Sequence, residues 1–237
     1  MEKSLVDIFN KIDNNEKLID SEMKTYINYS LTNHGGKLTG IRSCSTSCIC
    51  NEYCKHRMRN KRLVCAECYS KTLHEIQTLN FPDKMKRNTK FYSRYELTKN
   101  SIPFMNDSIV RFESFGDISN ELHFQNYCTI AAANKATFVL WTKNIKLIKK
   151  YTDCGGKIPK NLLIIYSIPR MNFIPTMKFY RKLKKVYPFI KKLFCVFTND
   201  FIQGNNIPIN CGGKQCLDCM TCYDPGNRKI FIFEKKK

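Results

Sequence analysis

Apolar and polar residues along the middle of the chain follow a pattern that predicts strands and helices in turn. Four apolar runs rich in β-branched and aromatic residues are expected to be strands, at residues 108–116, 137–142, 162–168 and 193–198. Segments of helical period separate these runs, and a further helix is expected from Met171 onwards. Continuous apolar strands separated by helices are typical of a parallel sheet that is covered on both faces. The pattern predicts an α/β fold with a mainly parallel sheet, open or barrel-like.

The beginning of the chain has a simpler, amphipathic pattern. Leu5, Ile8 and Ile12 are spaced for one face of a helix. We therefore expect a helical lead-in over residues 1–37, followed by a single α/β domain over residues 38–237.

The 13 cysteines are distributed unevenly along the chain. Ten of them form two groups, Cys44, Cys48, Cys50, Cys54, Cys65 and Cys68 near the start, and Cys211, Cys216, Cys219 and Cys222 near the end. In a cytosolic protein, clustered thiols mark metal or redox sites more often than disulfides. Cys65 and Cys68 have the CxxC spacing with which two thiolates bind one ion from a tight turn. We expect cysteine-rich metal-binding segments at both ends of the fold, with all ten thiols as candidate ligands.

The identity of the metal stays open between zinc and an iron–sulfur cluster. The tail spacing C-x4-C-x2-C-x2-C lacks the final step of the ferredoxin run but otherwise resembles it. Six thiols in the first group exceed the four ligands of one tetrahedral zinc, and His56 or His74 is an alternative ligand there. The second group has four thiols and suffices alone, so we expect two separate centres at the same end of the sheet. Cys128 and Cys195 lie in apolar segments and are expected to be buried.

The charge of the chain favours a polyanionic partner. Lys and Arg number 40 against 20 Asp and Glu, which gives a net charge of +20. Such an excess favours nucleic acid through phosphate neutralisation, although the codon usage of an AT-rich genome explains it equally well. Residues 84–95 interleave cations with aromatic side chains, which suits a nucleic-acid strand or the buried side of a helix. Without a signal core or an apolar run of spanning length, we expect a cytoplasmic protein with no membrane contact.

Three charged residues at predicted strand ends are candidates for catalysis. In parallel α/β sheets, sites lie at the carboxyl ends of the strands, where Glu113, Asp117 and Lys143 fall. Glu113 and Asp117 together suggest Mg²⁺ ligation and a metal-dependent nuclease. The alternative for Asp117 is a cap on the next helix, and the alternative for Lys143 is solvent or phosphate contact.

Four short motifs in the chain resemble a known protein family. GIRSCSTSC with CAECY, then VRFESFGD, WTK and CGGKQCLDCMTCY occur in this order. This layout is similar to that of the bacteriophage gene-88 product family and covers roughly residues 38–225. The chain departs from the family in its extra thiols in the first group and in having no histidine after the last strand. The resemblance implies a phage or prophage origin and the order of the motifs along the chain. It does not indicate which reaction, if any, the protein catalyses.

These features lead to one main functional hypothesis and two alternatives. We expect a phage-type metal- or iron–sulfur-binding protein that contacts nucleic acid. An iron–sulfur redox enzyme is the first alternative, because a barrel-like α/β core beside a cysteine cluster looks similar to radical-SAM proteins. Their CxxxCxxC motif is missing, since Cys44 and Cys48 are followed by Asn51, and Cys50 and Cys54 by Arg57. The nuclease is the second alternative.

Overall fold

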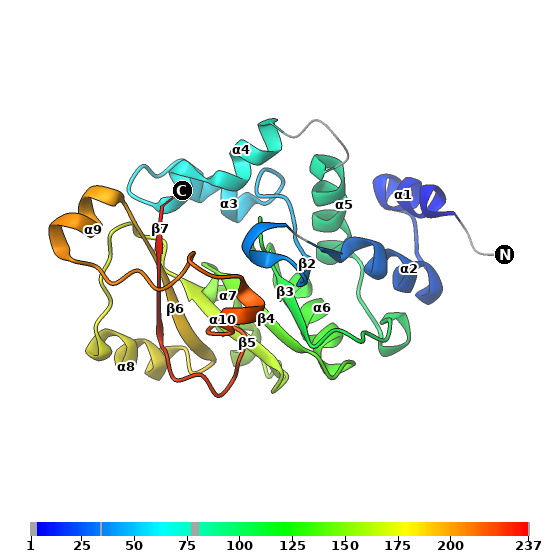
Figure 1. Cartoon of the computed structure of the whole chain (residues 1–237). Coiled ribbons are helices and arrows are strands. Elements are labelled where there is room, and N and C mark those ends of the chain that lie inside the picture. The colour runs from blue at the N-terminus through cyan, green and yellow to red at the C-terminus, as the bar shows by residue number, and fades with distance from the viewer. Residues whose placement is uncertain (1–3, 34, 77–80, 237) are drawn as a thin grey trace.

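The computed structural model describes residues 4–33, 35–76 and 81–236. Its centre is a sheet of seven strands whose order in space is their order along the chain (Figure 1). The strands are β1 (Thr32–Asn33), β2 (Arg42–Cys44), β3 (Ile109–Phe112), β4 (Thr137–Thr142), β5 (Leu162–Ser167), β6 (Ile190–Phe197) and β7 (Phe231–Lys235). Only β1 runs antiparallel to its neighbour, and β2 to β7 are parallel. The predicted α/β fold with a mainly parallel sheet is confirmed.

Helices connect the parallel strands and form the lead-in. The α-helices are α1 (Leu5–Asn14), α2 (Asp20–Ser30), α3 (Glu52–Met58), α4 (Tyr69–Ile76), α5 (Phe81–Arg94), α6 (Glu121–Ala132), α7 (Ile145–Asp153), α8 (Met177–Val186), α9 (Asn199–Asn205) and α10 (Cys216–Cys219). Three 3-10 turns join them, η1 (Gly36–Leu38), η2 (Val64–Glu67) and η3 (Lys99–Ser101). No described helix combines the length and the apolar character needed to cross a membrane.

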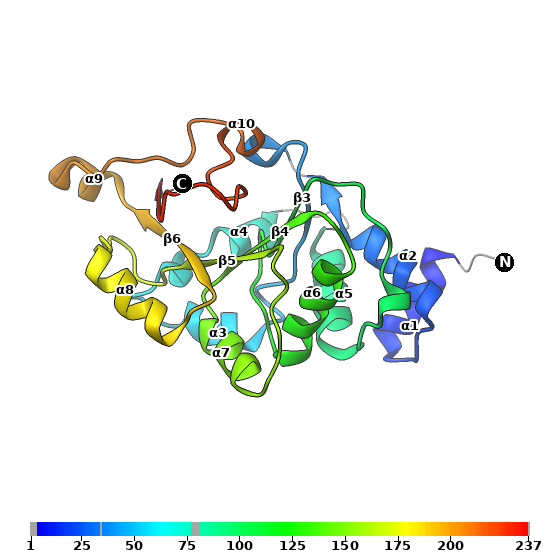
Figure 2. The same ribbon diagram turned by 90° about the horizontal axis from the view of Figure 1, so that it is seen from below.

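The alternation of side chains along each strand divides the core into two faces. On β4, Phe138 and Leu140 point into the larger core, which is formed with α1, α2, α5 and α6. Their neighbours Val139 and Trp141 point to the opposite face, against Tyr223 and the cysteine-rich tail. Figure 2 shows this arrangement, with α5, α6 and α7 on one side of the sheet and α10 on the other. The helices therefore cover one face, and the tail covers the other.

Several predicted boundaries differ from the structure, and one strand was not predicted. The fourth predicted strand, 193–198, is β6 and begins three residues earlier, at Ile190. β3 ends at Phe112, because Glu113 takes a left-handed conformation with φ 58° and turns the chain away from the sheet. α8 begins at Met177 rather than at Met171, where the Thr176 hydroxyl caps it by accepting from the Phe179 amide at 3.1 Å. The short polar strand β2 was not predicted, although it is the first strand of the parallel series.

Candidate functional site

Four of the six N-terminal thiols gather at the carboxyl ends of the parallel strands. We call Cys48, Cys54, Cys65 and Cys68 the first quartet. The Cys48 thiol donates a hydrogen bond to the Cys68 sulfur, which raises the pKa of Cys48 and lowers that of Cys68. Cys48 and Cys54, Cys54 and Cys65, and Cys65 and Cys68 also raise one another's pKa electrostatically, so the four thiols lie in one neighbourhood. The loop after β2, α3 and η2 bring them together.

Lys143, which follows β4, provides the positive charge next to the first quartet. Burial acts to lower the pKa of its ammonium, but Cys65 and Asp117 outweigh that effect and raise the pKa. Among the described residues, no carboxylate lies within ion-pair distance of the Lys143 Nζ. Lys143 is partly buried, and its ammonium interacts electrostatically with the thiols of Cys65, Cys54 and Cys68 and with Asp117. The sequence had suggested contact with solvent or phosphate instead.

The two remaining N-terminal thiols, Cys44 and Cys50, are placed elsewhere. Cys44 is the last residue of β2 and points into the helix-covered core, where the Tyr127 hydroxyl donates to its sulfur at 3.9 Å. Burial raises the pKa of Cys44 to about 12. Cys50 lies between Cys48 and Cys54 in sequence but is exposed to solvent. The expectation that all six thiols act as ligands is therefore not supported for these two positions.

Asp117 joins the end of β3 to the end of β4 instead of capping the next helix. Its carboxylate accepts from the Thr142 hydroxyl, from the Lys143 amide at 2.8 Å and from the Ile118 amide at 2.9 Å. The cap of α6 is Asn120, which accepts from the His123 amide at 2.9 Å, so the capping alternative is wrong. Burial raises the pKa of Asp117, and Lys143 partly offsets that rise.

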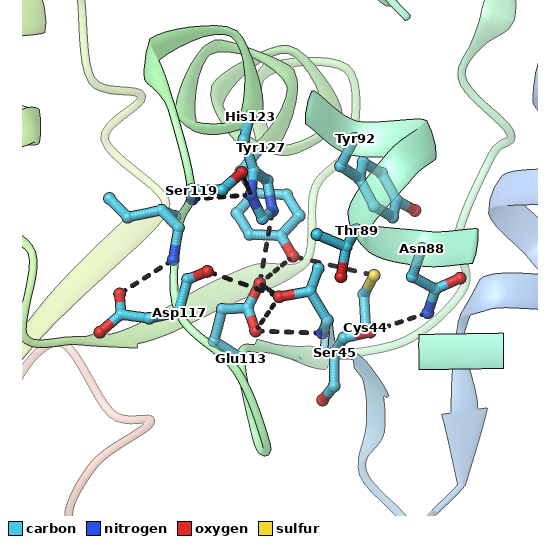
Figure 3. A network of polar contacts seen from close by, with 12 residues as sticks. Cys44, Ser45, Asn88, Thr89, Tyr92, Glu113, Asp117, Ser119, His123 and Tyr127 are labelled. Carbon is cyan, nitrogen blue, oxygen red and sulfur yellow. Dashed lines mark hydrogen bonds and ion pairs between the residues drawn. The ribbon is translucent and has the colours of Figure 1, made fainter. Parts of the chain in front are cut away.

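Glu113 is the centre of a buried polar network on the side of Cys44 (Figure 3). Its carboxylate accepts from the Thr46 amide at 3.1 Å, from the Thr46 hydroxyl at 2.9 Å and from the Tyr127 hydroxyl at 2.7 Å. His123 Nδ1 accepts from the Ser119 amide at 3.1 Å, so the proton of a neutral ring is on Nε2, which faces Glu113 at 3.3 Å. Gly116 must lack a side chain here, because a Cβ would lie 2.4 Å from the Thr46 hydroxyl. These donors occupy the carboxylate of Glu113.

The four C-terminal thiols form a second group over the tail-covered face of the sheet. We call Cys211, Cys216, Cys219 and Cys222 the second quartet. Cys222 has electrostatic contacts with the other three, and burial together with these contacts raises its pKa to about 12. The short helix α10 carries two of the thiols and packs on the turn at Gly40, where a Cβ would lie 2.7 Å from the Leu217 side chain. The second quartet lies over a sheet face, whereas it was expected at the same end as the first.

Arg111, in the middle of β3, faces the second quartet from the sheet. Its guanidinium carbon lies 4.0 Å from the centre of the Trp141 ring, and its Nε is buried without a hydrogen-bond partner. Burial acts to lower the pKa of Arg111, while Tyr223, Tyr69 and Cys216 raise it. Tyr223 contacts the guanidinium electrostatically, but its own hydroxyl also has no partner of regular hydrogen-bond geometry. No described carboxylate forms an ion pair with Arg111.

A cavity of about 540 Å³ adjoins the second quartet, and Lys37 forms part of its wall. The Lys37 ammonium pairs with Glu234 and also lies 3.7 Å from the Cys211 sulfur. Glu234 already neutralises Lys37, whereas Arg111 forms no ion pair with a described carboxylate. Lys214 and Lys229 add further positive charge to the wall of the same cavity.

The thiols of each quartet converge without forming a finished coordination site. Within residues 4–33, 35–76 and 81–236, no three or more Cys, His, Asp or Glu side chains are arranged so that they could hold a metal ion. His56 is exposed on the surface at the end of α3. The side chain of His74, the other predicted alternative ligand, lies outside the described residues.

The segment that mixes cations with aromatic residues, 84–95, packs inside the molecule. It lies largely in α5, where Phe91 and Tyr92 are fully buried. Arg87 pairs with Asp13 at 2.9 Å, so this cation contacts the lead-in region rather than open solvent. The buried side of a helix, one of the two alternatives for this segment, describes it correctly.

A comparison with known protein families identifies the chain's relatives. The model of the Gene product 88 family matches residues 8–225. The chain belongs to this family. The resemblance to the bacteriophage gene-88 products is thereby confirmed, and the match extends well into the helical lead-in. No curated protein matches the chain, and neither does any solved structure.

Sequence reasoning gave no role to Arg111, although the sequence contains a signal for it. A charged residue in the middle of the apolar run IVRF is unusual, since central strands of parallel sheets are buried on both faces. The donors to Glu113 were also missed. Thr46, His123 and Tyr127 come from distant segments, and their convergence depends on how the loop after β2 packs on α6.

Proposed function

We propose that this member of the Gene product 88 family is a metal–thiolate protein with two centres. The observation that carries the proposal is that a cation lies beside each thiol quartet and forms no ion pair with any described carboxylate. Lys143 faces the first quartet and Arg111 faces the second. A cation removed from water without a counter-charge costs several kcal/mol. Asp117 provides negative charge near Lys143, whereas Arg111 forms no ion pair with a described carboxylate, so a further negative charge is expected most clearly beside Arg111.

A metal ion with its thiolate ligands would supply that negative charge. Four thiolates around Zn²⁺ carry a net charge of about −2, and a thiolate-ligated iron–sulfur cluster is likewise anionic. Without metal, burial raises the pKa of Cys54 and of Cys222 so that both favour the neutral form. Hydrogen bonds lower the pKa of Cys68 and of Cys219, so each quartet holds one thiol that favours the thiolate, and metal binding would add to this negative charge. The positions of the two cations support the proposal of a metal-bound state. Binding would replace the thiol hydrogen bond between Cys48 and Cys68 and release protons.

Anaerobic purification followed by metal analysis and a visible spectrum tests this proposal. Two centres of zinc give about two equivalents of zinc per chain and no visible absorption, whereas iron–sulfur clusters give iron, sulfide and a broad visible band. A protein that is folded and holds neither metal after reconstitution with Zn²⁺ or with Fe²⁺ and sulfide contradicts the proposal.

An iron–sulfur redox or radical-SAM-like enzyme is the second candidate, and the position of the first quartet favours it. The quartet lies at the carboxyl ends of successive parallel strands, where α/β proteins place their reactive groups. An iron–sulfur cluster there would transfer single electrons, with Lys143 beside it. Reductive cleavage of S-adenosylmethionine distinguishes this candidate from a metal–thiolate protein without such activity. A radical-SAM-like enzyme should cleave it after reconstitution, and the Cys65→Ser variant should not.

The nuclease alternative receives no comparable support. Mg²⁺ needs carboxylate oxygens that are free to coordinate it. Glu113 and Asp117 are 2% and 3% exposed, and both carboxylates already accept hydrogen bonds from protein donors. We therefore assign these two residues to holding the strand ends together.

A further inference from the structure

The chain between the second and third thiols of the first quartet is unusually basic. Six of its residues, Lys55, His56, Arg57, Arg59, Lys61 and Arg62, are cationic or can become so. They lie on the end of α3 and on the turn that follows, a surface that we call the basic turn and define as residues 55–62. The Asn60 side chain shapes the turn by accepting from the Arg62 amide at 3.0 Å. A shallow pocket of about 520 Å³ lies among these residues.

The cations at the tip of the basic turn form no ion pair with an acidic residue of the described part of the chain. Lys55 pairs with Glu52 at 2.6 Å, and Arg57 lies over the Tyr53 ring. By contrast, Arg59, Lys61 and Arg62 are exposed, and no described carboxylate forms an ion pair with any of them. Their charges are therefore available to a partner.

The first quartet anchors both ends of the basic turn. The turn begins directly after Cys54 and ends shortly before Cys65, and these two thiols contact each other electrostatically. Close to Cys65, the Val64 amide donates to the Pro169 carbonyl at 2.8 Å, which fastens the turn to the loop after β5. A metal bound by both Cys54 and Cys65 would fix the spacing of the two ends.

We propose that the basic turn docks the phosphate backbone of nucleic acid and that metal in the first quartet holds it in the docking conformation. The second half of this statement rests on the proposed function. Arg is suited to phosphate because its planar guanidinium can donate two parallel hydrogen bonds. The net charge of +20 favours a polyanion.

A nucleic acid fits this surface better than a membrane or an apolar protein partner does. None of the large exposed apolar side chains of the described chain lies in residues 55–62. Membrane-binding amphipathic helices and the buried cores of protein interfaces carry such side chains beside their charges. The other basic and aromatic segment, 84–95, buries its aromatic rings and pairs Arg87 internally.

The charge-neutral variant Arg59→Gln/Lys61→Gln/Arg62→Gln tests the docking surface. The matched control is Lys178→Gln/Arg181→Gln/Lys182→Gln, which removes the same charge from exposed positions of α8, far from α3 (Figure 1). Binding to a short fluorescent single-stranded DNA and to its duplex is titrated at several salt concentrations. The basic-turn variant should bind roughly tenfold more weakly, and the slope of log K against log salt should fall by about 2 to 3. The control should keep the wild-type slope.

Equal losses in the two variants would overturn the docking surface, because only the total charge would then matter. Absence of binding by the wild type at low salt, or binding to phosphatidylserine vesicles in place of nucleic acid, would overturn it as well. Thermal melting should be the same for all three proteins, since the substituted side chains are exposed.

The variant Cys65→Ser tests the link to the metal, because it keeps every charge of the basic turn. Loss of metal together with weaker nucleic-acid binding is the expected result. Loss of metal with unchanged binding would overturn the link but leave the proposed function intact. If the wild type binds no metal and the charge-neutral variant still loses binding, the proposed function fails and the docking surface stands.

Discussion

The two thiol quartets each bring four cysteines close to a cation, but they do so in different surroundings. The first is enclosed at the carboxyl ends of the parallel strands, with Cys48 buried and Lys143 supplied by the loop after β4. The second lies on an irregular tail, beside a cavity, with Arg111 supplied by the middle of a strand. If metal binds, the first quartet would close loops at the end of the sheet, and the second would attach the tail to its face.

This difference indicates a division of roles. Tail residues 206–230 have no strand and only the four-residue helix α10. Their backbone hydrogen bonds to the sheet lie near the two ends of the segment, where the Asn210 and Cys211 amides donate to the Phe233 carbonyl and the Leu193 amide donates to the Ile230 carbonyl. A metal there would mainly stabilise the structure, because ligation energy becomes folding energy. The first quartet lies where α/β proteins place reactive groups and is backed by the buried networks of Asp117 and Glu113. A metal there suits chemistry or partner recognition.

The largest effect is expected from Cys219→Ser in the second quartet. The variant should lose about one zinc or one cluster per chain, and its melting temperature should fall by roughly 10 °C or more, because the tail loses its attachment. Metal analysis and thermal melting measure both quantities. Cys154→Ser, at an isolated and exposed thiol, is the control and should change neither. An unchanged metal content in Cys219→Ser would remove the second centre from the comparison.

Cys65→Ser should remove the first centre with a smaller loss of stability. The loops that it closes are also held by protein hydrogen bonds, such as those of the Asn51 side chain to the Asp117 carbonyl at 2.6 Å and to the Tyr53 amide at 3.0 Å. Metal content should fall by one centre, as measured by elemental analysis. Cys50→Ser is its matched control, and a loss of metal in that control would show that the exposed thiol belongs to the site.

Replacing one cation at a time should change the metal affinity of one centre only, while every cysteine ligand is kept. Arg111→Met should weaken metal binding at the second centre by roughly 10- to 100-fold, the range for groups that surround metal ligands. Lys143→Met should do the same at the first centre. Competition with a chelator measures each affinity, and Arg111→Lys should restore part of the loss. An equal effect of Arg111→Met on both centres would mean that the two sites share this cation.

The smallest effect on metal is expected from Glu113→Gln. The amide keeps the shape of the side chain but brings N–H donors against the Thr46 and Tyr127 hydroxyls, so we expect a stability loss of about 1 to 3 kcal/mol. The metal content of both centres should stay unchanged, because Glu113 is a structural acceptor. Denaturant unfolding and metal analysis give the two values. A missing metal in this variant would place Glu113 among the ligands.

Parts of the fold could be predicted because they depend on local pattern alone. β4 occupies the predicted residues 137–142, since its continuous apolar run is bounded by polar residues on both sides. β2 could not be predicted in this way. Its three residues include Arg42 and Ser43, and the strand exists because it pairs with β3. A strand that depends on tertiary pairing leaves no hydrophobic period in the sequence.

The spacing of the cysteines indicated metal but not which thiols belong together. Cys44 ends β2 on the helix-covered face, and the alternation of side chains along the strand turns it away from Cys48. The same alternation turns Arg111 toward the tail, opposite to Val110 and Phe112. Both outcomes depend on strand parity, which can be read only once the strand boundaries are known.

The agreement between strand order and chain order has a consequence for how the molecule is assembled during synthesis. Each new strand can add to the edge left by the previous one, so β2 to β6 can form before the tail exists. The thiols of the first quartet then leave the ribosome long before Lys143, whereas Arg111 is already in place when Cys211 emerges. At the first centre the thiols would be synthesised before Lys143, and at the second centre Arg111 would be synthesised before the thiols. Loading with metal would therefore follow a fixed time order, with the tail closing last over a finished sheet.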